Sequence, residues 1–217
     1  MKEIFPGVFS INNRLATENP FSGYKPFDGE LLKKGKKEFR MWNPTRSKAG
    51  AAIKKGIKEF PIKKDSKILY LGAAHGYTPS FLSNIIGKKG VIYAVEFSER
   101  CFNELLILCL KYKNIVPILA DARKPELYYW IEKVDVVYVD IAQPDETEIA
   151  VRNCKEFLKP NSYLMMAIKS RSIDVTKSPK EIYKNEIKKL KNSGFKIIDW
   201  KTLDPLEKAH AFIVAKL

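Results

Sequence analysis

Four charged residues stand where predicted strands end, beside a turn that contains two glycines. Each of them follows a mainly apolar run of strand length: Glu96, Asp121, Asp140 and Lys169. In an open α/β sheet, the ligand crevice lies outside the carboxyl ends of the strands. One charged strand end is ordinary, because loops are polar. Four of them at one edge predict a binding and catalytic site.

The turn itself has the sequence Leu-Gly-Ala-Ala-His-Gly-Tyr-Thr-Pro-Ser, over residues 71–80. Gly72 and Gly76 bracket it, and glycine lets the backbone approach a ligand that lies across the turn. We expect Thr78 to cap the following helix, with Pro79 at its first position. Two glycines at this spacing also occur in ordinary strand-to-helix turns, so the turn alone is a weak signal.

The second predicted strand adds to that signal. Residues 91–95 form an apolar run, and Glu96 follows it twenty residues beyond Gly76. Nucleotide-binding folds place an acid there to hold ribose hydroxyls. The turn lacks the G-x-G-x-x-G pattern of dinucleotide binders, so a single adenosine-type ligand such as S-adenosylmethionine fits better than NAD. Asp121 and the backbone of Ala122 are then expected to meet the adenine edge.

Alternating strands and helices from residue 67 onward predict a mostly parallel, doubly wound sheet with a helical layer on each face. The last two strands are joined by a short connection and should be antiparallel. The expected strands are 68–71, 91–95, 116–120, 134–139, 163–168, 195–200 and 211–215. Asp140 would lie nearest the glycine turn, and Lys169, one strand further, would face the substrate.

Residues 1–60 are predicted to form a small, mainly β domain, and residues 61–217 the larger α/β domain. Short strands are expected at 4–5 and 8–11, and a hairpin at 30–42 around the turn 33–36. A helix should begin near Lys48, with Ile57 and Phe60 continuing its apolar face.

Charge favours a polyanionic partner. The chain of 217 residues has a formal net charge of +14, and residues 1–60 hold 13 Lys/Arg against 6 Asp/Glu. Nucleic acid is the usual partner of such a surplus. The alternative explanation of the surplus is that the whole proteome is lysine-rich, with charge scattered over protein surfaces for solubility or heat tolerance. Three cysteines without metal-ligand spacing, and no signal or membrane-spanning run, favour a cytoplasmic protein.

Six stretches resemble the fibrillarin family. They are Trp42–Lys48, Leu71–Gly76, Val95–Ser98, Ala120–Arg123, Tyr138–Asp145 and Ile168–Asp174. The segment Asp-Ile-Ala-Gln-Pro-Asp is highly specific. Since the chain has no glycine/arginine-rich leader, it resembles the archaeal form. The resemblance implies a Rossmann-like S-adenosylmethionine-dependent methyltransferase fold with a seven-stranded sheet whose last strand is antiparallel.

The resemblance also implies an activity and partners. The activity is RNA 2′-O-ribose methylation inside a box C/D guide ribonucleoprotein, on guide-selected hydroxyls of pre-rRNA, with tRNA as a further candidate. The implied partners are box C/D guide RNA, target RNA, a Nop-family scaffold protein and a kink-turn-binding ribosomal-type protein. No membrane and no metal are expected.

The family's catalytic tetrad corresponds to Lys48, Asp140, Lys169 and His210. Its cofactor contacts carry over to the glycine turn and three strand ends, namely Gly72, Ala73, Gly76, Tyr77, Thr78, Glu96, Phe97, Asp121, Ala122, Asp140, Ile141, Ala142 and Gln143. Two turn residues, His75 and Tyr77, are bulkier than usual for the family, and Ala209 stands where the family has an aspartate. We interpret His75 as a lining residue that contributes its backbone.

Lys169 is the candidate for removing or polarising the proton of the 2′-hydroxyl. Asp140 is the candidate for fixing the orientation of Lys169. Two other functions stay open. One is a stand-alone methyltransferase for ribosomal RNA or a catechol-like molecule, although the latter needs a metal-binding acidic cluster that is not evident. The other is a non-catalytic RNA-binding subunit, against which the intact charged strand ends argue.

Overall fold

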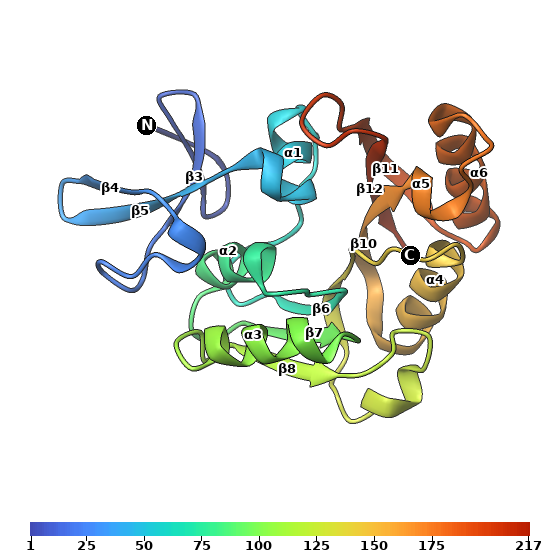
Figure 1. The fold of residues 1–217 in the computed structure, drawn as a ribbon, viewed down its shortest axis with the longest axis horizontal. Helices are drawn as coiled ribbons and strands as arrows, with labels where there is room; N and C mark the ends of the chain where they lie inside the picture. The colour runs from blue at the N-terminus through green and yellow to red at the C-terminus, as the bar shows by residue number, and fades with distance from the viewer.

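Two sheets organise the chain in the computed structural model, which describes the backbone of residues 1–217 and every side chain except that of Asp28. The smaller sheet is antiparallel in the order β1-β2-β3-β5-β4 (Figure 1). Its strands are β1 (Lys2–Phe5), β2 (Val8–Ile11), β3 (Arg14–Glu18), β4 (Leu31–Lys34) and β5 (Lys37–Trp42).

The larger sheet has the order β11-β12-β10-β9-β6-β7-β8. Five neighbouring strands run parallel, and β12 is antiparallel to both β10 and β11. The predicted Rossmann-like methyltransferase fold, with its antiparallel strand near the end, is therefore confirmed. The strands are β6 (Lys67–Leu71), β7 (Val91–Glu96), β8 (Ile115–Leu119), β9 (Val134–Val139), β10 (Leu158–Lys169), β11 (Lys196–Thr202) and β12 (His210–Lys216).

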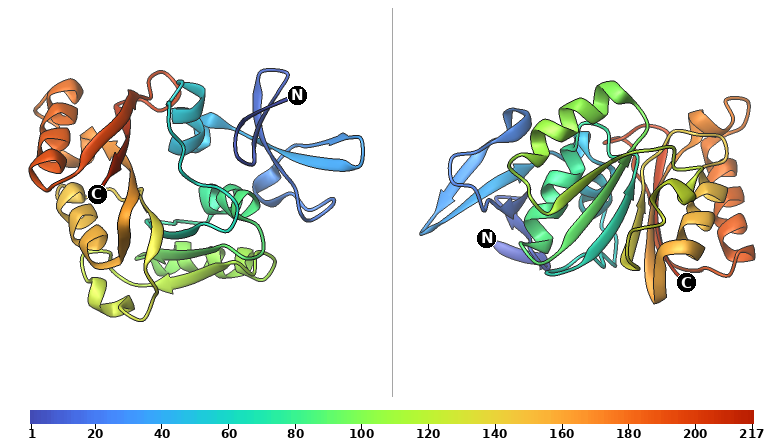
Figure 2. Two further views of the ribbon diagram at one scale, coloured as in Figure 1. Left: turned by 180° about the vertical axis from the view of Figure 1, so that it is seen from behind. Right: turned by 90° about the horizontal axis from the view of Figure 1, so that it is seen from below.

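Helices cover both faces of the larger sheet (Figures 1 and 2). One buried cluster joins it to α1 (Lys48–Lys54), α2 (Tyr77–Ile86) and α3 (Glu99–Cys109). A second joins its other face to α4 (Glu146–Phe157) and α6 (Pro179–Asn192), with α5 (Ser170–Ile173) beside them. The central strands β6 and β9 are buried on both faces, which explains their nearly continuous apolar sequences. Short 3-10 helices are η1 (Pro26–Asp28), η2 (Pro44–Arg46) and η3 (Pro125–Tyr128).

The smaller sheet is fixed to α2 through residues of β5. Trp42 stacks on Phe81 with ring centroids 4.9 Å apart. The buried guanidinium of Arg40 lies 3.6 Å from the centre of the same ring, and it donates to the Tyr112 hydroxyl and to Ser80 Oγ, both at 2.6 Å. Both terminal nitrogens of the buried cation are thus hydrogen-bonded, although its Nε has no partner among the described residues. Because a buried charge needs such partners, these contacts fix the position of the smaller sheet against the larger one.

One strand of the smaller sheet was not predicted. Asn12 and Asn13 both have positive φ, 49° and 62°, and they form the two-residue turn that leads from β2 into β3. Asparagine tolerates this conformation, and two such residues match the twist of a hairpin. The Asn-Asn pair was therefore a usable signal for the unpredicted strand Arg14–Glu18.

Two helix predictions were wrong in their bounds. The cap of α2 is Gly76, at φ 86°, and the helix begins at Tyr77, so Thr78 and Pro79 lie inside its first turn. Helix α1 ends at Lys54, and Ile57 lies beyond it although it is buried. The division at residue 60 stays a prediction, since one buried cluster runs across it.

None of the helices, over the residues that the structure describes, combines the length and hydropathy needed to cross a membrane.

Candidate active site

Three of the predicted catalytic residues meet at the carboxyl edge of the larger sheet. Asp140 directly follows β9, and Lys169 ends the neighbouring strand β10. The Lys169 ammonium lies 2.9 Å from Asp140 Oδ1, and it donates to the Asp140 carbonyl oxygen at 2.7 Å. Lys48, the first residue of α1, places its ammonium 3.7 Å from the same Oδ1. One carboxylate is therefore shared by two cations from different elements.

This cluster is partly buried, with 22% of the Lys48 side chain, 11% of Asp140 and 16% of Lys169 exposed. Charges at such depth interact more strongly than surface pairs, because less water screens them. The ammonium of Lys169 is held by two oxygens of Asp140, which limits the directions in which its third N–H can point. A positioned amine that solvent can still reach is suited to act on a bound hydroxyl.

His210 lies next to the cluster without bonding to it. It is the first residue of β12, and it stands opposite Lys169 in the antiparallel register. Its Nδ1 is 2.7 Å from the Lys208 carbonyl oxygen, so a proton on Nδ1 would be donated there. Among the described side chains, no hydrogen bond joins it to Lys48, Asp140 or Lys169.

A residue absent from the sequence predictions also touches Asp140. The Tyr70 hydroxyl, on β6, donates to Asp140 Oδ2 at 3.4 Å, and its ring stacks on Tyr138 of β9 at 4.4 Å. Burial raises the pKa of the Tyr70 hydroxyl well above its ordinary value, which keeps it a donor. The sequence signal was present, since Tyr70 interrupts an aliphatic strand, but a buried tyrosine there is equally typical of a core.

A cleft of about 240 Å³ opens beside this cluster, at the ends of β6, β7, β8 and β9. Closed pockets that enclose a whole ligand usually measure roughly 300–1,000 Å³, so this cleft would leave part of a ligand uncovered. Nine of the predicted cofactor residues line it: Gly72, Glu96, Phe97, Asp121, Ala122, Asp140, Ile141, Ala142 and Gln143. Lys169 lines the same cleft, which makes it continuous with the charged cluster.

Glu96 is oriented by the backbone on both sides of the cleft. Its Oε2 accepts from the Ala74 amide at 2.7 Å, and its Oε1 accepts from the Ser98 amide at 2.8 Å. The carboxylate thereby connects the glycine turn to the end of β7. A carboxylate has about four lone-pair sites, so two amides leave capacity for hydroxyl donors in the cleft.

Asp121 is engaged by its near neighbour Arg123, whose Nε and Nη2 donate to its carboxylate at 2.7 to 3.0 Å. These hydrogen bonds, with the charge of the guanidinium, lower the pKa of Asp121 below its ordinary value. Asp121 is therefore a fixed anion at the far end of the cleft from Lys169. The adjacent Ala122 lines the cleft with it.

The first glycine of the turn is required by the protein itself. Gly72 has φ 83°, and a Cβ built there would lie 2.7 Å from the Asp140 carbonyl oxygen. A side chain would therefore push β6 away from the residue that holds Lys169. The structure thus adds a constraint from the backbone of Asp140, and the approach of a ligand to this glycine stays a prediction.

Four other predicted cofactor residues do not line the cleft: Ala73, Gly76, Tyr77 and Thr78. The Thr78 hydroxyl donates to Ser47 Oγ at 3.0 Å, which ties α2 to the cap of α1. The Tyr77 ring points to the N-terminal sheet and lies 5.5 Å from the ring of Phe27. His75 also points away, since its Nδ1 is 3.2 Å from Glu104 Oε2 on α3.

A buried acid lies beneath Lys169. Glu146 begins α4, is 0% exposed, and accepts from the Lys169 amide through Oε1 at 3.2 Å. Its Oε2 has no hydrogen-bond partner among the described residues. Burial raises the pKa of Glu146 to about 9, so it is a neutral acid at pH 7. The sequence did not reveal it, because a glutamate in the first turn of a helix is usually solvated.

The glycine turn, the acid after the second parallel strand and the antiparallel β11–β12 pair define a Rossmann-like methyltransferase. A solved S-adenosylmethionine-dependent methyltransferase from Aquifex aeolicus shares this fold at TM-score 0.56 and 19% identity, over 81% of this chain and 98% of that one. More specifically, the family model for fibrillarin matches residues 1–217, and the chain belongs to the fibrillarin family.

Individual relatives are similar to this chain along nearly its whole length. The fibrillarin-like rRNA/tRNA 2′-O-methyltransferase of Sulfolobus acidocaldarius is 55% identical over 204 residues, covering 94% of this chain and 88% of that protein. A solved Aeropyrum pernix fibrillarin with natively bound S-adenosyl-L-methionine has TM-score 0.88 and 45% identity, over 96% and 92% of the two chains. A fibrillarin in complex with Nop5p has TM-score 0.89 and 41% identity, over 99% of each chain.

Proposed function

We propose that this chain is an RNA 2′-O-ribose methyltransferase, the catalytic subunit of a box C/D guide ribonucleoprotein. It transfers a methyl group from S-adenosylmethionine to guide-selected 2′-hydroxyls in rRNA and tRNA. The observation that carries the proposal is the Lys48–Asp140–Lys169 cluster, which opens onto the cleft at the sheet edge in a chain of the fibrillarin family.

The residues present in the cleft fit the cofactor. An oriented acid, Glu96, suits two ribose hydroxyls, and Asp121 with the Ala122 backbone suits the adenine edge. When bound, S-adenosylmethionine supplies a methyl group on a cationic sulfur. We assign Asp140 to that end, because its carbonyl lies against Gly72 and its carboxylate compensates nearby positive charge.

In this proposal Lys169 acts on the hydroxyl of the RNA ribose. A 2′-hydroxyl is a weak nucleophile, and removing or polarising its proton accelerates such reactions by ~10²–10⁴-fold. Asp140 holds the amine in place, Lys48 adds positive charge next to the same carboxylate, and Tyr70 donates to the second carboxylate oxygen. His210 lies beside Lys169 in the ladder, and we assign it to contacts with the RNA.

Target choice is assigned to the guide rather than to this chain. An A-form duplex exposes its 2′-hydroxyls in a shallow groove that carries little sequence information. We therefore propose guide RNA, a Nop-family scaffold protein and a kink-turn-binding protein as partners. The complex of a 41% identical fibrillarin with Nop5p supports the scaffold.

Replacing Glu96 by alanine is expected to weaken cofactor binding by roughly 1.5–3 kcal/mol, the value of hydrogen bonds to a charged group. Titration calorimetry with S-adenosylmethionine measures this change. Glu99→Ala, an exposed acid at the start of α3, is the matched control and should bind like the parent. Unchanged affinity in folded Glu96→Ala protein would remove Glu96 from the cofactor site.

The chain alone should transfer little labelled methyl to naked RNA and show little sequence preference. Its RNA binding should fall steeply with salt, because phosphate contacts release counterions. Adding guide RNA and both partner proteins should produce methylation at one nucleotide. Efficient site-specific methylation by the chain alone would instead identify a stand-alone methyltransferase.

A further inference from the structure

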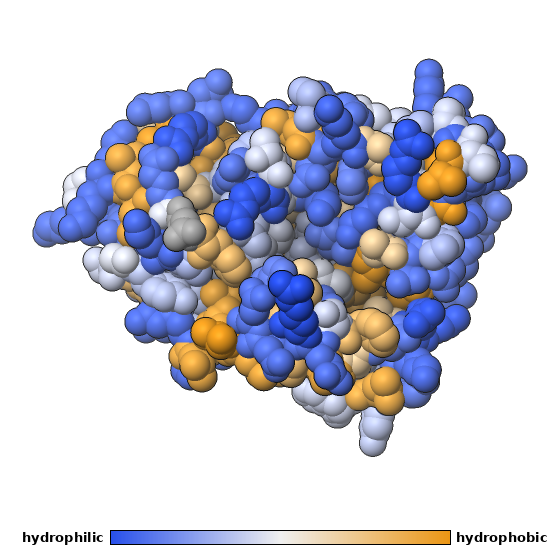
Figure 3. Space-filling view, in the orientation of Figure 1, coloured by the Kyte–Doolittle hydropathy of each residue, from blue (hydrophilic) through white to orange (hydrophobic). Residues whose placement is uncertain are grey.

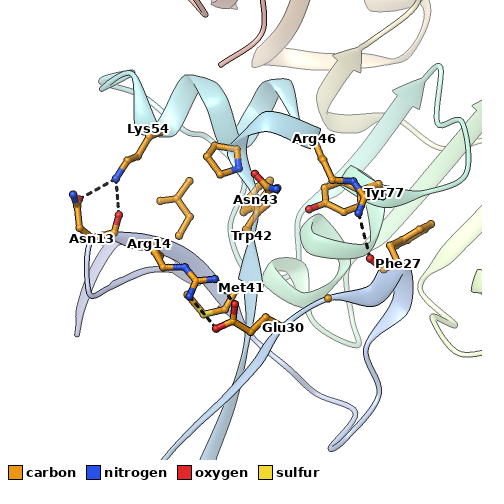
Figure 4. A pocket seen from close by; sticks show the side chains of 13 residues that line it. Asn13, Arg14, Phe27, Glu30, Met41, Trp42, Asn43, Arg46, Lys54 and Tyr77 are labelled. Atoms are coloured by element: carbon orange, nitrogen blue, oxygen red, sulfur yellow. Dashed lines mark hydrogen bonds and ion pairs between the residues drawn. The ribbon is translucent and has the colours of Figure 1, made fainter. Parts of the chain in front are cut away.

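A second cavity, of about 440 Å³, lies between the smaller sheet, η2, the end of α1 and the start of α2 (Figure 4). It is separate from the cofactor cleft, and the two share no lining residue. The buried Trp42 is among its lining residues, together with Arg14, Lys54, Arg46 and Tyr77. A volume of this size is in the range of small-molecule sites.

One side of this cavity is a stacked pair. The guanidinium of Arg46 lies 4.5 Å from the centre of the Tyr77 ring, and its Nη1 donates to the Phe27 carbonyl oxygen at 3.3 Å. The Phe27 ring in turn lies 5.5 Å from that of Tyr77. The planar cation is thus held with one face on an aromatic ring and the rest exposed. Such a plane is a stacking platform for a nucleic-acid base.

The described lining of this cavity carries three cations, Arg14, Arg46 and Lys54, and one acid, Glu30. Arg14 pairs with Glu30 through both guanidinium nitrogens, at 2.9 and 2.5 Å. Lys54 instead donates to the side-chain and carbonyl oxygens of Asn13, at 2.9 and 2.5 Å. The partners of Lys54 are neutral oxygens, so they orient its ammonium without cancelling the positive charge. Such a charge can bind a phosphate.

The cavity adjoins the catalytic cluster through a short rigid segment. Arg46 ends η2, Ser47 caps α1, and Lys48 reaches Asp140. On the other side Tyr77 begins α2, and its neighbour Thr78 bonds to Ser47. Polar side chains cover most of the face on which the molecule is hollowed (Figure 3). An RNA strand that runs from Lys48 along this segment would next reach the exposed face of the Arg46 guanidinium.

We propose that this cavity binds one nucleotide of the RNA strand that carries the methylated ribose, at a position near the target that is not paired with the guide. Its base stacks on the exposed face of the Arg46 guanidinium, and its phosphate is held by Lys54. The inference rests on the proposed function, because it takes the target to be RNA. It adds a positioning site on the N-terminal side of the protein, outside the cofactor cleft.

The test uses the assembled particle with guide RNA and compares Arg46→Ala, Arg46→Lys and Lys54→Ala with the parent. Arg46→Ala should raise the half-saturating concentration of substrate RNA about 10-fold, the range of one lost stacking contact. Arg46→Lys keeps the positive charge but lacks the planar guanidinium, so it should recover only a minor part of the affinity for substrate RNA that Arg46→Ala loses. Lys54→Ala, which removes the phosphate contact, should lower the slope of log affinity against log salt by about one. Lys184→Ala, on the exposed side of α6, should match the parent.

A second readout locates the nucleotide directly. Substrate RNAs with 4-thiouridine at successive positions beside the target should crosslink to the Arg46–Tyr77 segment at one position, and Arg46→Ala should abolish that crosslink. Thermal unfolding and cofactor affinity at parental values show that the variants are folded.

Two outcomes would overturn the inference, and a third would overturn the proposed function alone. If the parent methylates guided RNA while both alanine variants saturate like the parent and no position crosslinks, the cavity binds no RNA and the proposed function stands. If the variants no longer bind the scaffold protein, while RNA crosslinks only outside the cavity in both parent and variants, the cavity is a contact site for a protein. If the parent itself transfers no methyl group yet crosslinks at this cavity, the proposed function fails and the RNA site stands.

Discussion

Replacing Lys169 by alanine is expected to lower the single-turnover rate of methylation by ~10²-fold or more, the range for losing a positioned acid or base. Lys169 contacts Asp140 and lines the cleft together with Asp121, and the proposed function places it on the substrate side. Cofactor affinity and particle assembly should therefore change little. Rapid-quench measurement of methyl transfer and calorimetry with the cofactor separate these effects. Lys159→Ala, at the opposite end of β10, is the matched control.

Lys169→Arg distinguishes two roles of the amine. Arginine keeps positive charge but stays protonated at any usable pH. If the arginine variant recovers most of the rate, Lys169 acts through charge and orientation and does not take the proton. If it is as slow as the alanine variant, proton removal is supported. Loss of cofactor binding in both variants would contradict the placement of Lys169 on the substrate side.

Glu146→Gln is expected to stabilise the protein increasingly as the pH rises. The folded pKa of about 9 lies above the ordinary value of 4.5, so the folded state holds a proton that the unfolded state releases between those values. The parent's free energy of unfolding should fall, relative to the variant, by about 1.4 kcal/mol per pH unit between pH 5 and 8. Glutamine keeps the oxygen that accepts from the Lys169 amide and cannot ionise.

Urea unfolding at several pH values measures this difference. The charges that act on Glu146 belong to Lys169, Glu186 and Asp140, and the ammonium of Lys169 opposes the effect of the two carboxylates. Glu148→Gln is the control on the same helix, since Glu148 is exposed and pairs with Lys189 at 3.0 Å. Its curve should parallel the parent. A parallel curve for Glu146→Gln would show that Glu146 is ionised in the folded protein.

The pairing of Asp140 with Lys169 could be anticipated because it depends on strand order. Asp140 and Lys169 end consecutive strands, and consecutive strands of such folds are usually neighbours, so the two side chains had to meet. The same reasoning could place His210 opposite Lys169 only after the register of the antiparallel strand was known. Glycine spacing and apolar strand lengths were enough for the larger sheet.

The direction of Tyr77 could not be read from the turn. Gly76 takes a left-handed conformation and caps the helix, which begins at Tyr77. The Tyr77 ring therefore points toward Phe27 and not into the cofactor cleft. Contacts between the two sheets decide this, and they depend on residues far apart in the chain. Glu146 illustrates the same limit, since its burial follows from packing between α4, α6 and β10.

The central claim is that guide pairing brings a 2′-hydroxyl to the Lys169 cluster. The most direct measurement reprograms the guide in the reconstituted particle and maps the methylated nucleotide on the matching substrate RNA. Moving the complementary segment by one nucleotide should move the methyl group by one nucleotide, and Lys169→Ala should slow the formation of both products by ~10²-fold or more. A methyl group that stays at one sequence whatever the guide, or that persists in Lys169→Ala at the parental rate, would contradict the account.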